Sequence, residues 1–202
     1  MQELAAGLHH WTARHPVIRT RVHCTYAAPA RALIDPLVPD EGLEAFDGLP
    51  RPEVVLLTNR HHYRHSDRFQ RVFGCVVRAS APGMHEFEGT EREVEPFAWG
   101  EEVAPGIVAH EVGVLCPDES ALHIQHGAGA LAVADGVVRL RSADLGFVPD
   151  HLLGADPQAI RRGLRASYAR LLELDFDALL LAHGEPFADG GKDALRAFTD
   201  GG

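Results

Sequence analysis

The pattern of apolar and polar residues divides the chain into many short strands and a few helices. Short runs rich in β-branched residues and bounded by turn formers predict strands. These strands cover residues 21–26, 32–34, 54–57, 75–78, 107–114, 121–126, 130–134 and 178–181. The run at 54–57 is apolar throughout, which predicts a strand buried on both faces. Residues 81–104 are rich in Gly, Pro and Glu and predict loops with a short strand or two.

Helix signals are fewer. The clearest helix opens at Asp156 and Pro157, which favour the cap and the first helical position. Its apolar stripe is Ile160, Leu164, Tyr168, Leu171 and Leu172. Ser66 is predicted to cap a helix that ends at Gly74, and shorter helices are predicted after Asp40 and over 192–198. Strands and helices in this order predict an α/β (α+β) fold of two mixed sheets flanked by helices, with residues 1–202 in a single domain.

Composition narrows the class of protein. Hydrophobic residues make up 46% and charged residues 24%, as in globular proteins. No apolar run reaches the roughly 18 residues of a membrane span, and the start of the chain lacks the order of a signal peptide. Three scattered cysteines argue against a disulfide framework or a cysteine zinc site. We therefore expect a cytoplasmic protein that does not bind membranes.

The net charge of the chain bears on the class of molecule that it binds. Acidic residues outnumber basic ones 29 to 19, which gives a formal net charge of −10. Proteins that bind nucleic acid gain affinity by neutralising phosphates with Lys and Arg, and no basic block is present. Nucleic acid is therefore not expected to be a partner of this protein.

A dense polar loop follows the buried strand at 54–57. Residues 58–66 hold three histidines, His61, His62 and His65, before the helix that Ser66 is predicted to cap. Corners between a strand and a helix are where α/β scaffolds expose functional side chains. A solvated polar loop is the alternative interpretation.

Two further positions follow predicted strands. His183 with Gly184 comes after 178–181, where a glycine lets the backbone approach a ligand closely. Asp135 ends the strand at 130–134 and suits either a metal-facing carboxylate or a turn. His123 is expected to face solvent, because its neighbours Leu122 and Ile124 would face the core.

In this order, the segments resemble the metallo-β-lactamase superfamily over residues 21–186. The matching segments are the strand Ala32-Leu33-Ile34-Asp35, the loop from Thr58 in place of T-H-x-H-x-D-H, residues 116–124 in place of P-G-H-T-x-G-S, Ala134-Asp135 in place of Gly-Asp, and Ala182-His183-Gly184 in place of G-H-G. The resemblance implies an αββα sandwich. It also implies a site for two zinc, iron or manganese ions, which activate water for hydrolysis.

Three of the seven metal-binding positions keep the family's residue, namely His61, Asp135 and His183. The other four carry Asn59, Tyr63, Arg64 and Glu119. The resemblance therefore implies His61, Glu119, Asp135 and His183 as metal ligands, for at most one ion. A guanidinium cannot donate a lone pair to a metal, so Arg64 is expected to replace the second ion and pair with Asp135. A shifted loop in which His61, His62 and His65 supply the imidazoles is the alternative.

Two functions follow from this interpretation. In the first, the protein lacks the dinuclear centre and is a non-catalytic module that binds a small molecule in a polar pocket. That pocket would include Asn59, His62, Tyr63 and His65. In the second, it is a hydrolase with one zinc, iron or manganese ion, acting on a small ester, thioester or lactam-like substrate. Asp135, His183 and Arg64 would then be its catalytic residues.

Overall fold

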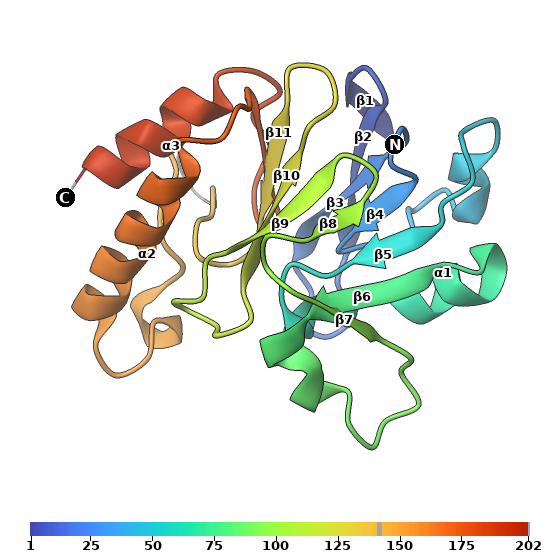
Figure 1. The fold of residues 1–202 in the computed structure, drawn as a ribbon, viewed down its shortest axis with the longest axis horizontal. Coiled ribbons are helices and arrows are strands. Elements are labelled where there is room, and N and C mark those ends of the chain that lie inside the picture. Colours follow the sequence, from blue (N-terminus) through green and yellow to red (C-terminus); the bar gives the residue numbers. More distant parts are fainter. Residues whose placement is uncertain (141–142, 202) are drawn as a thin grey trace.

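Two β-sheets pack face to face, with helices on both outer faces (Figure 1). The computed structural model describes residues 1–140 and 143–201. The first sheet contains β1 (Gln2–Ala5), β2 (Leu8–Arg14), β3 (Arg21–Ala27), β4 (Ala32–Ile34), β5 (Val54–Leu56), β6 (Val76–Ser80) and β7 (Glu95–Phe97), side by side in chain order. The second contains β8 (Glu102–Ala104), β9 (Ile107–Glu111), β10 (Ser120–Ile124), β11 (Ala130–Val133) and β12 (Ala178–Leu181), also in chain order. Each sheet is thus built from its own half of the chain.

The strand directions bring several strand ends to one edge of the sandwich. β4, β5 and β6 are parallel to one another, as are β11 and β12. Two backbone hydrogen bonds join the sheets near these ends: the N–H of His23 donates to the carbonyl of Ala182 at 3.0 Å, and the N–H of Ser120 donates to that of Thr58 at 2.8 Å. Residues that follow β4, β5, β11 and β12 therefore meet at one end of the molecule.

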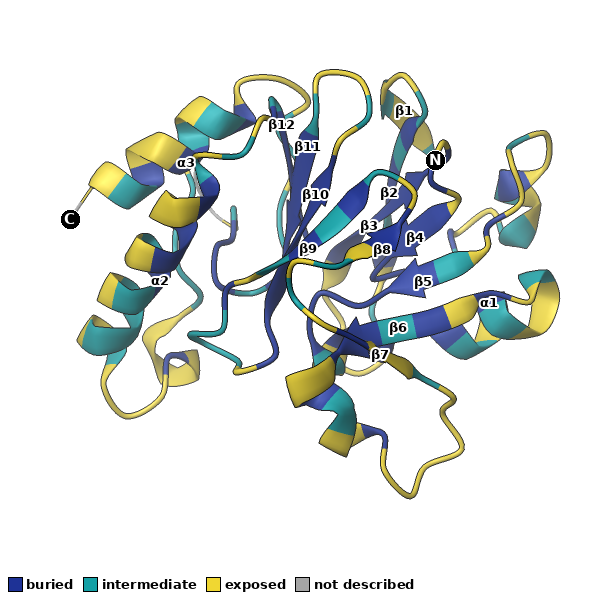
Figure 2. Ribbon diagram, viewed as in Figure 1, coloured by how far each residue is buried: buried dark blue, intermediate teal, exposed yellow. Residues whose placement is uncertain are grey.

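The core has three apolar layers because both faces of each central strand are covered. Between the sheets, Ile34 and Leu56 of the first pack with Leu122, Ala132 and Leu180 of the second. Outside the first sheet, Val55 and Leu57 pack with Phe69. Outside the second, Leu131, Val133 and Leu179 pack with Leu164 and Tyr168. Figure 2 shows these strands as largely buried, and the helices as exposed on their outer sides. This arrangement explains why the strands at 54–57 and 178–181 are apolar throughout.

Three α-helices form the outer layers: α1 (Ser66–Phe73), α2 (Pro157–Leu171) and α3 (Gly191–Asp200). Asp156 caps α2 by accepting the N–H of Ala159 at 2.9 Å. α1 is followed by Gly74 with φ 71°, as predicted. Its N-cap is His65 rather than Ser66, whose hydroxyl donates to the carbonyl of Tyr63.

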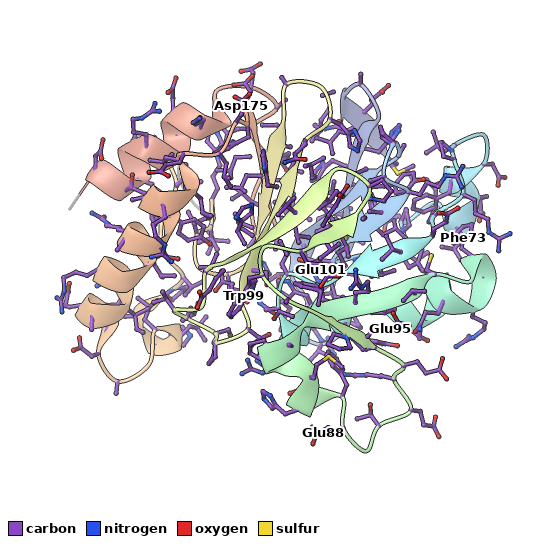
Figure 3. All side chains as sticks on the ribbon, in the orientation of Figure 1. Phe73, Glu88, Glu95, Trp99, Glu101 and Asp175 are labelled. Carbon is purple, nitrogen blue, oxygen red and sulfur yellow. The ribbon has the colours of Figure 1, made fainter. Side chains whose placement is uncertain are left out.

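Two expectations from the sequence are wrong. His123 is only 6% exposed, and its Nε2 lies 2.8 Å from the carbonyl oxygen of Asp175, which Figure 3 labels. The helical layer covers this face of β10, so the face opposite Leu122 and Ile124 is not solvated. In addition, β9 ends at Glu111 rather than at residue 114.

The hairpin of β1 and β2 was not predicted. Polar residues interrupt its apolar positions, yet β2 pairs with β3 along its whole length. The chain passes from the first sheet to the second near Trp99 and Glu101 (Figure 3).

Within the described ranges, no helix has both the length and the apolar character that crossing a membrane requires.

Candidate metal centre

Three side chains converge where the two sheets meet. Ligand atoms of His62, Asp135 and His183 all lie within 4.8 Å of one another. The Nε2 atom of His183 is 3.0 Å from Oδ1 of Asp135, and Nε2 of His62 is 3.4 Å from the same oxygen. Two imidazoles thus point at one carboxylate oxygen.

The topology explains this convergence. Asp135 follows β11 and His183 follows β12, and these adjacent strands are parallel, so both residues emerge at the same edge. His62 comes from the opposite sheet, in the short 3₁₀ segment Arg60–Tyr63 that follows β5 and is kinked at His62 (φ −91°, ψ 21°). The chain turns sharply after His183, because Gly184 has φ 126° and a Cβ there would lie 2.4 Å from the carbonyl oxygen of Arg139.

A second set of polar groups orients the three residues. Nδ1 of His62 lies 2.9 Å from Oδ2 of Asp35, which follows β4 and is 2% exposed. Asp35 also accepts the backbone N–H of Thr58 at 2.9 Å, and the hydroxyl of Thr58. On the other side, Nδ2 of Asn59 donates to Oδ2 of Asp135 at 2.9 Å. These contacts leave Nε2 of His62 and Oδ1 of Asp135 directed at the shared space.

The electrostatics of the group follow from burial and opposite charges. Burial alone would raise the pKa of Asp135, but His62 and His183 hold that pKa well below its usual value. Burial would likewise lower the pKa of His62, yet Asp35 and Asp135 together raise it to about 9. The pKa of Asp35 is also lowered against the effect of burial, chiefly by His62. Carboxylates and imidazoles therefore stabilise each other's charges.

The donor set fits one divalent ion. Two imidazole nitrogens and one carboxylate oxygen are ligands that zinc, iron and manganese accept, with positions left open for solvent or substrate. The contact between Asp35 and His62 has the form of the carboxylate that orients a metal-binding histidine from behind. No further His, Cys, Asp or Glu within the described chain completes a second group of this kind.

Solved structures share this architecture. No family model matches the sequence, and a search of curated proteins finds no match either. A metallo-beta-lactamase family protein from Thermus thermophilus aligns with a TM-score of 0.67 and 18% identity, over 98% of this chain and 80% of that chain. A metallo-beta-lactamase from Hirschia baltica aligns at 0.68 and 15%, over 98% and 95%. A protein solved in a di-iron-bound form aligns at 0.61 and 22%, over 92% and 91%.

This chain has the metallo-β-lactamase fold. The αββα sandwich predicted from the sequence is thereby confirmed. Identities of 14% to 22% establish the architecture alone, and the chemistry depends on the residues at the centre.

Within the metallo-β-lactamase fold, the structure corrects the position of one histidine. His62 lies beside Asp135 and His183, whereas His61 is exposed and its ring makes no hydrogen bond to a described residue. The reason is local: Asn59 caps the 3₁₀ turn by accepting the N–H of His61 at 2.9 Å, and the turn directs His62 inward. A shifted loop was the alternative, but only His62 of its three histidines joins the group.

The expected pair of Arg64 and Asp135 is also wrong. Nη1 of Arg64 donates to two backbone carbonyls, that of His23 at 2.9 Å and that of Asp35 at 2.6 Å. The residue has φ 46°, so the backbone turns its side chain toward β3 and β4. Arg64 thus ties the loop to the first sheet, while the charge of Asp135 is balanced by the two histidines.

Two other residues of the predicted pocket have partners away from the centre. Tyr63 is buried, and its hydroxyl donates to Oε1 of Gln70 at 3.1 Å. His65 accepts the N–H of Val38 at 3.1 Å through Nδ1. Neither residue belongs to the converging group, so the pocket inferred from the sequence keeps only Asn59 and His62 at the centre.

Glu119 lies next to the centre but outside the converging group. Its side chain is fully buried, and Oε1 accepts the N–H of Gly136 at 2.8 Å and the hydroxyl of Tyr168 at 3.2 Å. Burial, and then the charge of Asp135, raise the pKa of Glu119 to about 7. Oε2 has no hydrogen-bond partner among the described residues. Glu119 is therefore placed to support the loop of Asp135 rather than to share its ion.

Sequence reasoning missed the roles of Asp35 and of a buried histidine pair. Asp35 appeared only as the end of a strand, although its left-handed φ of 48° could not be read from the sequence. Nε2 of His10 lies 2.9 Å from Nδ1 of His23 between β2 and β3. Burial, with smaller contributions from neighbouring histidines, lowers the pKa values of both rings to about 4. Polar residues that alternate with apolar ones along a strand are usually exposed, so the sequence pattern did not indicate that His10 and His23 are buried.

Proposed function

We propose that this protein binds one divalent transition metal ion through His62, Asp135 and His183, and hydrolyses a small ester, thioester or lactam-like substrate. The convergence of their ligand atoms within 4.8 Å carries the proposal. A bound ion supplies Lewis acidity at neutral pH. The chain's own contribution is to fix the ligands, through Asp35 behind His62 and Asn59 behind Asp135.

The aligned structures share the fold of this chain. One of the aligned proteins was solved in a di-iron-bound form. In this chain, Asn59, Tyr63 and Arg64 replace ligands that the family would use for two ions, and the side chains of the latter two bind elsewhere. A single ion is therefore the stoichiometry that the side chains favour.

A cleft supports a small-molecule substrate. It has a volume of about 440 Å³ and is lined by His10, Trp11, Arg21 and Glu185, among others. Glu185 follows His183 by two residues, and His10 contacts His23, whose N–H binds the carbonyl of Ala182. The cleft thus adjoins the loop that carries His183, and its size is in the range of small-molecule sites.

The second candidate is a non-catalytic module that binds a small molecule without a metal. Its support is that Asn59, His62 and His183 all lie within 3.4 Å of the carboxylate oxygens of Asp135, so protein groups surround this partly buried charge. A partly buried charge with such partners needs no metal for stability.

Elemental analysis and hydrolysis assays separate the two candidates. The full chain would be expressed in medium supplemented with zinc, iron and manganese, and metal per chain would be counted. One equivalent is expected, together with chelator-sensitive hydrolysis of p-nitrophenyl acetate, a thioester or a chromogenic cephalosporin. The His183→Ala variant should lose both, while His151→Ala, which changes an exposed histidine, should lose neither.

Each other outcome has a definite meaning. Two equivalents of metal would contradict the single-ion proposal. No metal after supplementation would favour the metal-free binding module. One equivalent without hydrolysis of any of the three substrate classes would retain the metal site and reject the hydrolase.

A further inference from the structure

The cleft beside the candidate metal centre continues the space between the two sheets. In β2, Leu8 packs in the core between the sheets, and the alternation of the strand places His10 and Thr12 on the same face. Both residues line the cleft of about 440 Å³. Glu185, which follows β12 of the second sheet, also lines it, and its Cα atom lies no more than about 7 Å from that of His183. A molecule that fills the cleft therefore lies beside the loop of His183.

Most charged groups that line the cleft are paired with each other. The guanidinium of Arg21 donates to Oδ2 of Asp40 at 3.0 Å, and to the hydroxyl and the carbonyl of Thr12 at 3.0 and 3.2 Å. Oε1 of Glu41 accepts a hydrogen bond from the amino group of Met1 at 3.1 Å. Neither of these two cations is left to balance a further carboxylate.

The carboxylate of Glu185 has no such partner. Its side chain makes no hydrogen bond or ion pair with a described residue. Nη1 of Arg139 reaches only its backbone carbonyl, at 3.3 Å. The guanidinium of Arg139 also donates to the carbonyl of Ala143, and its Cζ atom lies 4.2 Å from the centre of the Phe187 ring. Among the described residues, the cleft thus presents one unpaired carboxylate.

The buried side of the cleft holds a neutral imidazole with an unpartnered nitrogen. His10 is 4% exposed, and its Nε2 lies 2.9 Å from Nδ1 of His23. Its own Nδ1 has no hydrogen-bond partner among the described residues. Burial, and then His23, lower the pKa of His10 to about 4, so the ring does not neutralise Glu185 at pH 7. In the tautomer in which Nε2 donates to His23, Nδ1 is a hydrogen-bond acceptor.

We infer that the cleft binds a positively charged amino group of the ligand, with Glu185 as its counterion and Nδ1 of His10 as a second acceptor. The inference rests on the proposed function for the reacting group, so the substrate is an ester, thioester or lactam that also carries an ammonium group. A ligand that covers Glu185 removes water from its carboxylate, and a cation offsets that loss where a neutral group does not. Glu185 is thus a specificity-determining residue.

Two variants with the same change in net charge test the role of Glu185. Glu185→Gln keeps the size of the side chain and removes its charge. Glu88→Gln makes the same change at an exposed residue, labelled in Figure 3, that does not line the cleft. An effect of net charge alone would appear in both variants, whereas the loss of a counterion would appear only in Glu185→Gln.

The first measurement needs neither metal nor hydrolysis. 4-Aminobutanamide and pentanamide have the same chain length, and only the first carries an ammonium group at pH 7. NMR titration of the metal-free protein should show that 4-aminobutanamide binds about tenfold more tightly than pentanamide. Glu185→Gln should bring the two affinities together, and Glu88→Gln should keep them apart. Equal affinities in the wild type, a difference that survives in Glu185→Gln, or no binding of 4-aminobutanamide at millimolar concentrations would overturn the inference.

The second measurement uses the zinc-loaded protein and two p-nitrophenyl esters, those of 4-(trimethylammonio)butanoate and 5,5-dimethylhexanoate. The esters have the same shape, but only the first is cationic, and its quaternary nitrogen cannot attack its own ester. The wild type should favour the cationic ester about tenfold in kcat/KM. This ratio should fall toward one in Glu185→Gln and persist in Glu88→Gln. A ratio that Glu185→Gln does not change would contradict the role of Glu185.

The outcomes for the ammonium site and for the hydrolase are distinguishable. Hydrolysis of both esters with equal kcat/KM values overturns the inference and keeps the hydrolase. Selective binding of 4-aminobutanamide without hydrolysis of either ester keeps the ammonium site and rejects the hydrolase. If zinc does not load, the single-metal function fails, and the titration with the two amides decides on Glu185 separately.

Discussion

Oδ2 of Asp35 lies 2.9 Å from Nδ1 of His62, and this contact decides which histidine of the loop reaches the candidate metal centre. The carboxylate is buried at the end of β4, so it can accept the ring proton only from a histidine that points between the sheets. Nε2 of the same ring faces Asp135, and it is the atom that would bind a metal on release of its proton.

The first prediction separates adjacent histidines. His62→Ala should abolish stoichiometric metal binding, because it removes one of the three ligands that converge among the described residues. His61→Ala should leave it unchanged, because that side chain is exposed. Metal per chain after dialysis against a weak chelator is the measurement. Loss of metal in His61→Ala would restore the assignment made from the sequence.

The second prediction concerns the positioning carboxylate. Asp35→Asn should weaken metal binding about 10- to 100-fold, as is typical when a partner behind a ligand is removed. It should not change the number of metal ions bound at saturation. Competition with a fluorescent zinc chelator gives the affinity. An unchanged affinity would mean that Thr58 alone orients His62.

The third prediction concerns Arg64. Its guanidinium bonds the carbonyls of His23 and Asp35, so Arg64→Ala should lower the free energy of unfolding by about 2 kcal/mol by leaving buried acceptors unpaired. Metal stoichiometry should stay the same. Urea unfolding and elemental analysis of one preparation test both statements. A second equivalent of metal in the variant would show that Arg64 blocks a site.

The fourth prediction is a pH dependence of stability in the metal-free protein. Burial lowers the pKa values of His10 and His23 from 6.5 to about 4. Between these pH values the two histidines are protonated in the unfolded chain but neutral in the folded chain. The stability that the two neutral histidines allow is fully present above pH 6.5, and it is lost as the pH falls toward 4. At pH 5 the loss should be about 1 kcal/mol per ring, after allowance for solvent screening.

Urea unfolding at pH 7 and pH 5 measures this loss. Changing both residues to Leu should reduce the difference between the free energies of unfolding at pH 7 and pH 5, because the variant lacks the two buried histidines that titrate differently in the folded and unfolded states. A difference that persists in the double variant would assign the pH dependence to other groups.

The fifth prediction uses two glycines with positive φ. Gly184→Ala should lower the free energy of unfolding by about 2 kcal/mol or more and weaken metal binding, because its Cβ would meet the carbonyl oxygen of Arg139 at 2.4 Å beside His183. Gly190→Ala is the matched control: its φ is 63°, but no atom lies within 4 Å of the added Cβ. It should show only the smaller backbone cost of about 1 kcal/mol. Equal losses in both variants would mean that contact with Arg139 is unimportant.

The sequence predicted the strands that build the centre, because β5, β11 and β12 are apolar on both faces and end at polar residues. Asp135 and His183 could be found for the same reason, since each follows such a strand after a single alanine. His62 could not, because a 3₁₀ turn with three adjacent candidate side chains gives no periodicity that selects one of them.

Other errors share a physical cause. Arg64 was expected to balance Asp135 because a buried carboxylate needs a counterion, but its left-handed backbone conformation directs it elsewhere. His123 was assigned to solvent because a sheet with one open face alternates apolar and polar residues, whereas the helices close that face here. Both errors depended on contacts between segments far apart in the chain.

The assignment of each sheet to its own half of the chain has a consequence for how the centre comes into being. Asp35, Asn59 and His62 belong to the half ending at β7, and Asp135 and His183 to the half beginning at β8. Neither half alone contains all three converging ligands. Two separately produced fragments divided near Trp99 would therefore be inert toward metal until they associate, and an ion captured on mixing would report their reassembly.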